Sequence, residues 1–185
     1  MKDNIENKEI WSFNESFLWQ NEHAECGNSK QSPINIDSNI LQNCNTLCDF
    51  EVIYKSSKCF LNYNNNKITI KYSTGSYLKF KNILYELKEI TIHTPSLHSI
   101  DNQKYDLEIC LIHSLGGNNS TSNGVMLCIL FEAGPNFGGP EQFINQIINE
   151  IPSENIDYDK EIIVSEDWGA NMLIPENKSF FMYDG

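Results

Sequence analysis

The side chains best suited to chemistry lie in two short segments that alternate polar and apolar residues. In the first, isoleucines separate Glu89, Thr91 and His93, and in the second, Glu108 and Cys110 alternate with aliphatic residues. Residues two apart on a β-strand share a face, so pairing of the two strands would place all five side chains on one wall. Imidazole, thiolate and carboxylate are groups that bind transition metals and transfer protons. This wall is therefore the candidate site.

Two motifs accompany this wall and are specific in combination, although each alone is a weak signal. They are CGNSKQSPINI at residues 26–36 and His-x-Pro-Ser-x-His at residues 93–98. Further matching segments are Trp11-Ser12-Phe13, Trp19, Leu61–Asn64, Met172–Glu176 and Phe180–Tyr183. Over nearly the whole chain, these segments resemble the alpha-class carbonic anhydrases. The resemblance implies a mainly β fold with a twisted, largely antiparallel central sheet, few short helices and the family's last strands missing.

The resemblance places the family's three zinc-binding histidines on Thr91, His93 and Cys110, so that only His93 is still a histidine. The family residues that lie behind the zinc-binding histidines fall on Glu89 and Glu108. A catalytic zinc needs three protein ligands and an open position for water. A threonine hydroxyl is a poor ligand, and a cysteine thiolate would partly cancel the charge of the metal and make the bound water less acidic. We therefore expect no bound metal, although zinc is the family's cofactor.

Other functional positions of the family are also altered. The catalytic glutamate falls on Leu97, beside His98, and leucine cannot accept the hydrogen bond that orients the zinc hydroxide. The proton-shuttle histidine falls near Asn66. The family's Leu-Thr-Thr-Pro-Pro motif would follow Gly185, where the sequence ends. The resemblance thus implies that no residue is catalytic and that carbon dioxide is not hydrated.

The residues of the wall also have structural interpretations. His93 fits a core histidine held by a carboxylate, and Cys110 fits a small buried thiol on an apolar strand. A buried network that joins Glu89 and Glu108 to His93 or to His98 would offset the cost of burying the two carboxylates. We expect His98 and His113 to be structural. An improvised metal site made of His93, Cys110 and Glu108 is the sharper alternative.

The composition excludes several classes of partner. The chain has a net charge of −12, and all 13 of its basic residues are lysines. Nucleic acids, heparin and anionic membranes need clustered cations, and bidentate recognition of phosphate needs arginine. No segment approaches the roughly 20 apolar residues of a membrane-spanning helix. We therefore expect a protein partner rather than a polyanion or a bilayer.

Six cysteines allow disulfides without proving them. The resemblance gives Cys26 a structural role, as half of a disulfide whose partner would follow the last residue. Three cysteines between residues 44 and 59 lie close together in the sequence and could form one bridge. Cys110 and Cys128 lie in apolar strand patterns, and we expect both to be reduced.

Indications of the cellular location are sparse. Glycosylation sequons begin at Asn14, Asn118, Asn119 and Asn177. Together with the disulfide of Cys26 that the resemblance to extracellular family members implies, they favour a secreted or cell-surface protein. The first residues are polar and show no apolar core of a signal peptide.

The elements that would position the wall follow from periodicity. Residues 1–25 form a polar arm of a single domain that spans residues 1–185. Alternating or apolar runs predict strands, in addition to those of the wall, at residues 33–36, 50–54, 68–72, 77–80, 84–87 and 125–131. Apolar residues at helical spacing predict an amphipathic helix over Glu141–Ile151.

Three classes of function follow. The altered ligand positions favour a pseudoenzyme that acts as a binding or interaction domain. The first alternative is an active or weakly active lyase that converts carbon dioxide and water to bicarbonate at a rebuilt zinc site. The second is a structural or surface domain of a larger protein. Because the family's last strands are missing, an exposed sheet edge would also permit self-association.

Overall fold

The structure is a computed structural model that describes residues 20–21, 23–44, 49–64, 67–115, 124–134, 139–150, 162–176 and 179–185. Contacts divide the chain into two compact units. The larger contains Ile34–Met182, and the smaller combines the described residues up to Pro33 with Tyr183–Gly185. In the smaller unit, the Ser32 and Tyr183 hydroxyls are hydrogen-bonded at 2.6 Å. Within the ranges given above, no helix is long and apolar enough to cross a bilayer.

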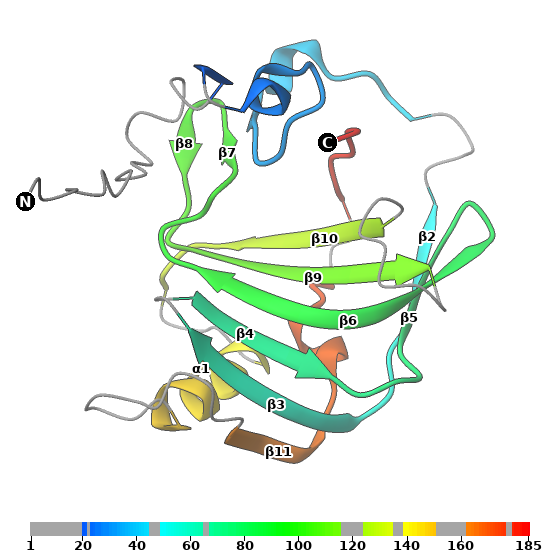
Figure 1. Cartoon of the computed structure of the whole chain (residues 1–185), viewed down its shortest axis with the longest axis vertical. Helices are drawn as coiled ribbons and strands as arrows, with labels where there is room; N and C mark the ends of the chain where they lie inside the picture. Colours follow the sequence, from blue (N-terminus) through cyan, green and yellow to red (C-terminus); the bar gives the residue numbers. More distant parts are fainter. Residues whose placement is uncertain are drawn as a thin grey trace, which may run out of the picture. The chain divides into compact units, whose positions relative to one another are not determined.

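The larger unit is built on an eight-stranded sheet of described residues, shown in Figure 1, in which every pairing is antiparallel. Across the sheet the strands are β10 (Gly124–Phe131), β9 (Leu107–Leu115), β6 (Ile83–His93), β4 (Lys67–Tyr72), β3 (Ser57–Asn64) and β11 (Ile162–Trp168). Two shorter strands, β5 (Tyr77–Phe80) and β2 (Phe50–Ile53), extend from β6 in that order.

Shorter elements complete the described fold. A small sheet contains β1 (Asn35–Ile36), β7 (Ser99–Ile100) and β8 (Gln103–Lys104), with β1 and β7 parallel. The helices are α1 (Gly139–Glu150) and the 3-10 turns η2 (Ala24–Gly27), η3 (Ser38–Ile40) and η4 (Ala170–Leu173). In the larger unit, α1 packs against β11 and η4.

Two tight turns set the register of neighbouring strands. Lys81 and Asn82 connect β5 to β6, and Asp101 and Asn102 connect β7 to β8. All four residues have positive φ values, between 49° and 65°. Two consecutive residues with positive φ are what a type I′ hairpin turn requires, and asparagine and aspartate tolerate this conformation well. The chain therefore reverses direction in tight two-residue turns at residues 81–82 and 101–102.

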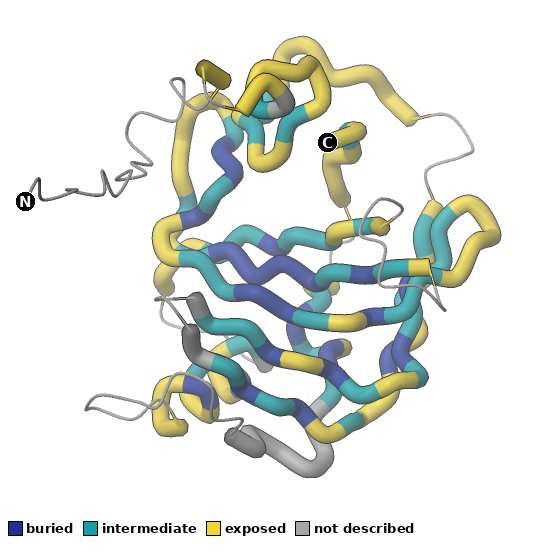
Figure 2. Tube along the Cα trace, viewed as in Figure 1, coloured by how far each residue is buried: buried dark blue, intermediate teal, exposed yellow. Residues whose placement is uncertain are grey.

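Alternation along the central strands produces one apolar face. Ile70, Ile90 and Leu111 lie directly opposite one another on β4, β6 and β9, and all three are 0% exposed. Phe143 and Ile147, one turn apart on α1, are buried in the same core. Figure 2 shows the buried residues concentrated along the middle of these strands. Because successive side chains alternate, the residues between them lie on the opposite face of the sheet.

The fold class predicted from the sequence is confirmed. The predicted strands at residues 50–54, 68–72, 77–80 and 125–131 form, and the predicted helix at residues 141–151 is α1 over its described part. The segments 84–87 and 89–93, expected as separate strands, instead belong to the single strand β6, whose register shifts between Leu87 and Glu89. The arm at residues 1–25 lies mostly outside the described residues.

Candidate functional site

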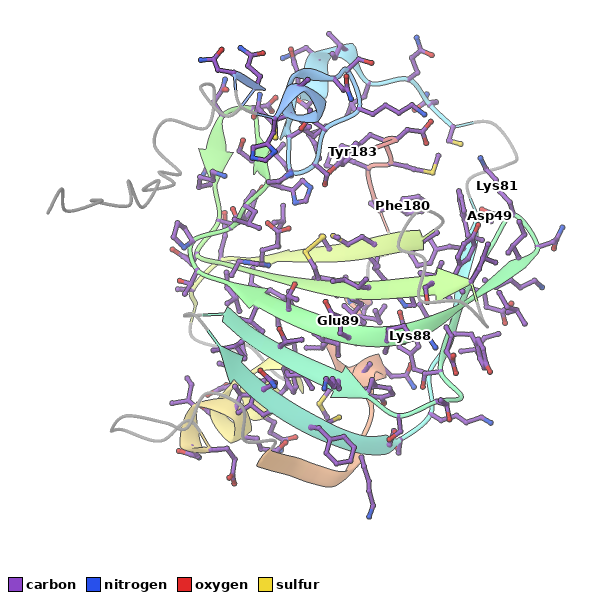
Figure 3. All side chains as sticks on the ribbon, in the orientation of Figure 1. Asp49, Lys81, Lys88, Glu89, Phe180 and Tyr183 are labelled. Atoms are coloured by element: carbon purple, nitrogen blue, oxygen red, sulfur yellow. A yellow bond between two sulfur atoms is a disulfide. The ribbon has the colours of Figure 1, made fainter. Side chains whose placement is uncertain are left out.

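The candidate wall forms where β6 pairs with β9. Thr91 lies directly opposite Cys110, and His93 lies directly opposite Glu108. These pairs place the four side chains on one face, as the alternation predicted. Thr91, Glu108 and Cys110 are buried and His93 is half-buried. The fifth member, Glu89, is half-buried and lies opposite Lys71 of β4; Figure 3 labels it on β6.

Two of the three wall residues on β6, Thr91 and His93, bind each other. His93 Nε2 lies 3.1 Å from Thr91 Oγ1, so the imidazole and the hydroxyl form a hydrogen bond along one strand face. These are two of the positions on which the sequence resemblance places the family's zinc ligands. The hydroxyl supplies no anionic or imidazole donor for a metal at its position. His93 therefore contributes the one imidazole of the family's ligand triad.

Glu108 is the centre of a buried hydrogen-bond network. Its Oε1 lies 2.5 Å from His98 Nδ1, and its Oε2 accepts the backbone N–H groups of Leu97 at 2.7 Å and His98 at 2.8 Å. Burial opposes ionisation, but the hydrogen bonds from His98 and from the two backbone groups lower the pKa of Glu108 below its usual value. The carboxylate thus organises the loop between β6 and β9. Of the two candidate partners for this glutamate, the structure pairs it with His98.

The sequence resemblance places the family's catalytic glutamate on Leu97 and its proton-shuttle histidine near Asn66. The backbone N–H of Leu97 belongs to the Glu108 network, and its half-buried hydrocarbon side chain offers no hydrogen-bond acceptor. Asn66 lies outside the described residues. The orienting carboxylate that the family has at the first position is therefore not replaced by an equivalent group there.

The expectation that Cys110 and Cys128 are reduced is wrong. The two cysteines form a disulfide that joins β9 to β10, drawn as a yellow bond in Figure 3. They lie directly opposite each other in the strand register, with a Cα–Cα distance of 4.1 Å. Such a distance belongs to the closer class of antiparallel pair, whose side chains approach most nearly. The apolar pattern of each strand indicated burial, but only the register between strands brings the two sulfurs together.

The remaining cysteines occupy different environments. Cys26 is a half-buried free thiol in the smaller unit. Cys59 is a free thiol on β3, where burial raises its pKa to about 12. Cys44 is disulfide-bonded, but the expected bridge among the cysteines at residues 44–59 stays a prediction, because Cys48 lies outside the described residues. Neither free thiol belongs to the candidate wall.

His113 is held in the interior away from the wall. Its Nδ1 lies 3.1 Å from the Val125 carbonyl, and its Nε2 lies 2.8 Å from the Tyr54 hydroxyl. The carbonyl can only accept, so Nδ1 carries the proton and Nε2 accepts from the tyrosine. Burial lowers the pKa of His113 to about 4. The imidazole is therefore neutral at pH 7 and connects three segments of the core.

A second cluster of possible metal donors lies beside the wall. Within the described part of the chain, donor atoms of His98, Glu108 and Cys128 lie within 4.8 Å of one another. Cys128 was not predicted to belong to the site, because its place there depends on the register of β10. At the positions on which the sequence resemblance places the family ligands, Thr91 offers only a hydroxyl and the Cys110 sulfur is bonded to another sulfur, and these groups do not fit a catalytic zinc.

Comparison with known proteins agrees with this architecture. The family model described as eukaryotic-type carbonic anhydrase matches residues 14–185. Dioscorin DB3L of Dioscorea polystachya is 30% identical over 138 residues, which are 70% of this chain and 49% of the dioscorin. A carbonic anhydrase of Nostoc sp. is 27% identical over 176 residues, which are 84% of this chain and 56% of the relative.

The chain thus spans about half the length of these two relatives. Among solved structures, a hyperthermostable carbonic anhydrase from a hydrothermal vent chimney has a TM-score of 0.71 and 26% identity. That comparison covers 88% of this chain and 68% of the other. From the antiparallel sheet and the match over residues 14–185, we conclude that the chain belongs to the eukaryotic-type carbonic anhydrase family.

Proposed function

We propose that this chain is a carbonic-anhydrase-like pseudoenzyme, without catalytic zinc or carbon dioxide hydratase activity, that acts as a protein-binding domain. The observation that carries the proposal is the Cys110–Cys128 disulfide at a family ligand position. A disulfide sulfur is not a thiolate, and the thiolate is the form that ligates zinc. With Thr91 at a second ligand position, His93 is the only family-type donor of the three.

The loss of ligands matters because of charge as well as affinity. Three neutral imidazoles leave the full charge of zinc to act on the bound water, whose pKa then falls to about 7. Even changes behind the ligands commonly cost about 10–100-fold in metal affinity or activity. Loss of two of the three imidazoles should have a larger effect. Leu97 further deprives the site of the carboxylate that the family uses to orient the hydroxide.

The binding role is supported by the free edge of the main sheet. Among the described strands, β10 pairs only with β9, and Met126 on β10 is 51% exposed. An edge strand presents unpaired backbone N–H and C=O groups that can pair with another chain. A protein segment or a second copy of the chain can supply those groups, whereas β10 itself has no lysine to attract a polyanion.

The proposal is tested by stopped-flow measurement of carbon dioxide hydration with the full chain and excess zinc. We expect the rate to equal that of buffer containing zinc alone. Zinc-dependent turnover above that rate, lost in a His93→Ala variant, would show that the site has been rebuilt and that the chain is an enzyme.

A matched variant restores the family residues at the altered positions. The triple change Thr91→His, Leu97→Glu and Cys110→His removes the disulfide and supplies two imidazoles and a carboxylate. We expect this variant to bind one zinc ion per chain in a calorimetric titration, because the rows Thr91–Cys110 and His93–Glu108 already have the required strand register. Failure to bind zinc would mean that the backbone of the wall no longer suits the metal.

A further inference from the structure

We propose that reduction of the Cys110–Cys128 disulfide creates a binding site for a thiophilic divalent cation such as zinc, with the two cysteine sulfurs and Glu108 as ligands. His98 would orient the carboxylate as a positioning residue. This set differs from the family triad, because it uses β9 and β10 and leaves out His93. The proposal goes beyond the proposed function: it concerns a different, redox-dependent metal site.

The first argument is the convergence of donors at one place. Cys110 and Cys128 are directly opposite in the strand register, and the Cys110 sulfur lies 3.0 Å from Glu108 Oε1. The sulfur of Cys128 lies within 4.8 Å of donor atoms of Glu108 and His98. Two thiolates and a carboxylate, with one open position, form a donor set that suits zinc. Small adjustments of three neighbouring side chains would bring these atoms around one ion.

The second argument is the contact between Glu108 and the Cys110 sulfur. A disulfide sulfur has no proton, so in the oxidised protein this 3.0 Å contact to a carboxylate is not a hydrogen bond. In the reduced protein, the Cys110 thiol can donate to Oε1. A cation that displaces the thiol protons would instead be shared between the carboxylate and the sulfurs. Either state would add an attractive interaction at Oε1, where the disulfide sulfur offers no proton.

The third argument is the support behind the carboxylate. Ligating carboxylates are commonly held by outer hydrogen bonds, and loss of such a partner costs about 10–100-fold in metal affinity. Glu108 has three such hydrogen bonds, from the His98 ring and from the backbone N–H groups of Leu97 and His98. The carboxylate is therefore positioned before any ion arrives, which reduces the entropic cost of binding.

The redox step needs a reductant that the protein does not supply, and a dithiol is the appropriate class. A thiolate of the dithiol attacks the sulfur of Cys128, because Cys128 is half-buried whereas Cys110 is only 2% exposed. The Cys110 sulfur leaves as a thiolate and takes up a proton. The second thiol of the reagent then displaces Cys128 and closes a cyclic disulfide. Two electrons and two protons pass from the dithiol to the protein, and zinc later releases the two thiol protons.

Such an ion would not restore hydration of carbon dioxide. Two thiolates and one carboxylate bring three negative charges to a divalent cation, so the site carries a net negative charge. Water bound there is far less acidic than water on a zinc with three neutral imidazoles. The site is therefore suited to a structural or sensing ion.

The test uses the full chain and cobalt(II) as the probe, because thiolate-to-cobalt charge transfer gives near-ultraviolet absorption. The protein is reduced with excess dithiol, freed of reagent by anaerobic gel filtration and titrated. We expect one cobalt per reduced chain with the charge-transfer band, loss of the band when zinc is added, and no band for the oxidised chain. Absence of the band from the reduced chain, or equal binding by both forms, would overturn the proposal.

Variants separate this site from other thiols. Cys128→Ser should lower cobalt affinity more than about 100-fold, and His98→Gln should lower it about 10–100-fold while the charge-transfer band at saturation stays the same. Cys26→Ser is the matched control, since it removes a half-buried free thiol of the other unit. Circular dichroism checks that each variant is folded. Undiminished affinity in a folded Cys128→Ser protein would contradict the assignment. Failure here would leave the hydration result unaffected.

Discussion

The buried imidazole of His113 makes acid sensitivity a quantitative test of the core. Its pKa falls from 6.5 to about 4 because burial disfavours the charged ring, with Tyr54 as the titratable group that contacts it. A group whose pKa is lowered by folding stabilises the protein above the unfolded value. That stabilisation is lost as the pH falls from about 6.5 toward 4, since the unfolded chain takes up the proton first.

The magnitude follows from the two pKa values. Between pH 7 and pH 5, proton uptake by the unfolded state should reduce the free energy of unfolding by about 2 kcal/mol through this single residue. Glu108, whose pKa folding lowers from its ordinary value of 4.5, adds acid sensitivity in the same direction only below about that pH, outside this window. A comparison with a His113→Gln variant removes that contribution, because the amide can still donate to the Val125 carbonyl and accept from Tyr54 but does not titrate.

The assay is urea denaturation of both proteins at pH 7 and pH 5, followed by intrinsic fluorescence. We expect the protein without the substitution to have a higher free energy of unfolding at pH 7 than at pH 5. Its advantage over the variant should shrink by about 2 kcal/mol at pH 5. Parallel loss of stability in the two proteins would refute the argument that His113 is buried and neutral.

Three further predictions concern single contacts. Leu111→Ala should lower the free energy of unfolding, measured by urea denaturation, by about 2–5 kcal/mol, because Leu111 is 0% exposed. Leu115→Ala on the same strand should lower it much less, because Leu115 is 38% exposed. Equal losses in the two variants would contradict the core assignment. Glu108→Ala should cost about 3–5 kcal/mol by leaving His98 and two backbone groups without their acceptor, and a loss below 1 kcal/mol would argue against the network. Asn35→Ala should cost about 1 kcal/mol, because Asn35 Oδ1 accepts from the Ser99 hydroxyl and the Asn102 N–H; an unchanged denaturation midpoint would count against both bonds.

The sequence predicted the fold class and the wall because both depend on local periodicity. Alternation in β6 and β9 was sufficient to place Thr91, His93, Glu108 and Cys110 on one face. The strand β11 was not predicted, since IIVSEDW does not alternate and its pairing with β3 contains two register shifts.

The state of the cysteines could not be predicted because it depends on the register between strands. Cys110 and Cys128 are 18 residues apart, and each alone looks like a buried apolar residue. The donor cluster of Cys128, Glu108 and His98 could not be predicted either, because it also depends on the register between strands. A one-residue shift of β10 would move Cys128 to the opposite face, so no single-strand pattern identifies this pair.

The central claim is that the family ligand positions of the oxidised chain do not hold zinc. The most direct measurement is calorimetric titration of zinc into the oxidised full chain at pH 7, with His93→Ala as the matched variant. We predict no stoichiometric binding to either protein. Binding of one zinc per chain, abolished by His93→Ala, would contradict the claim.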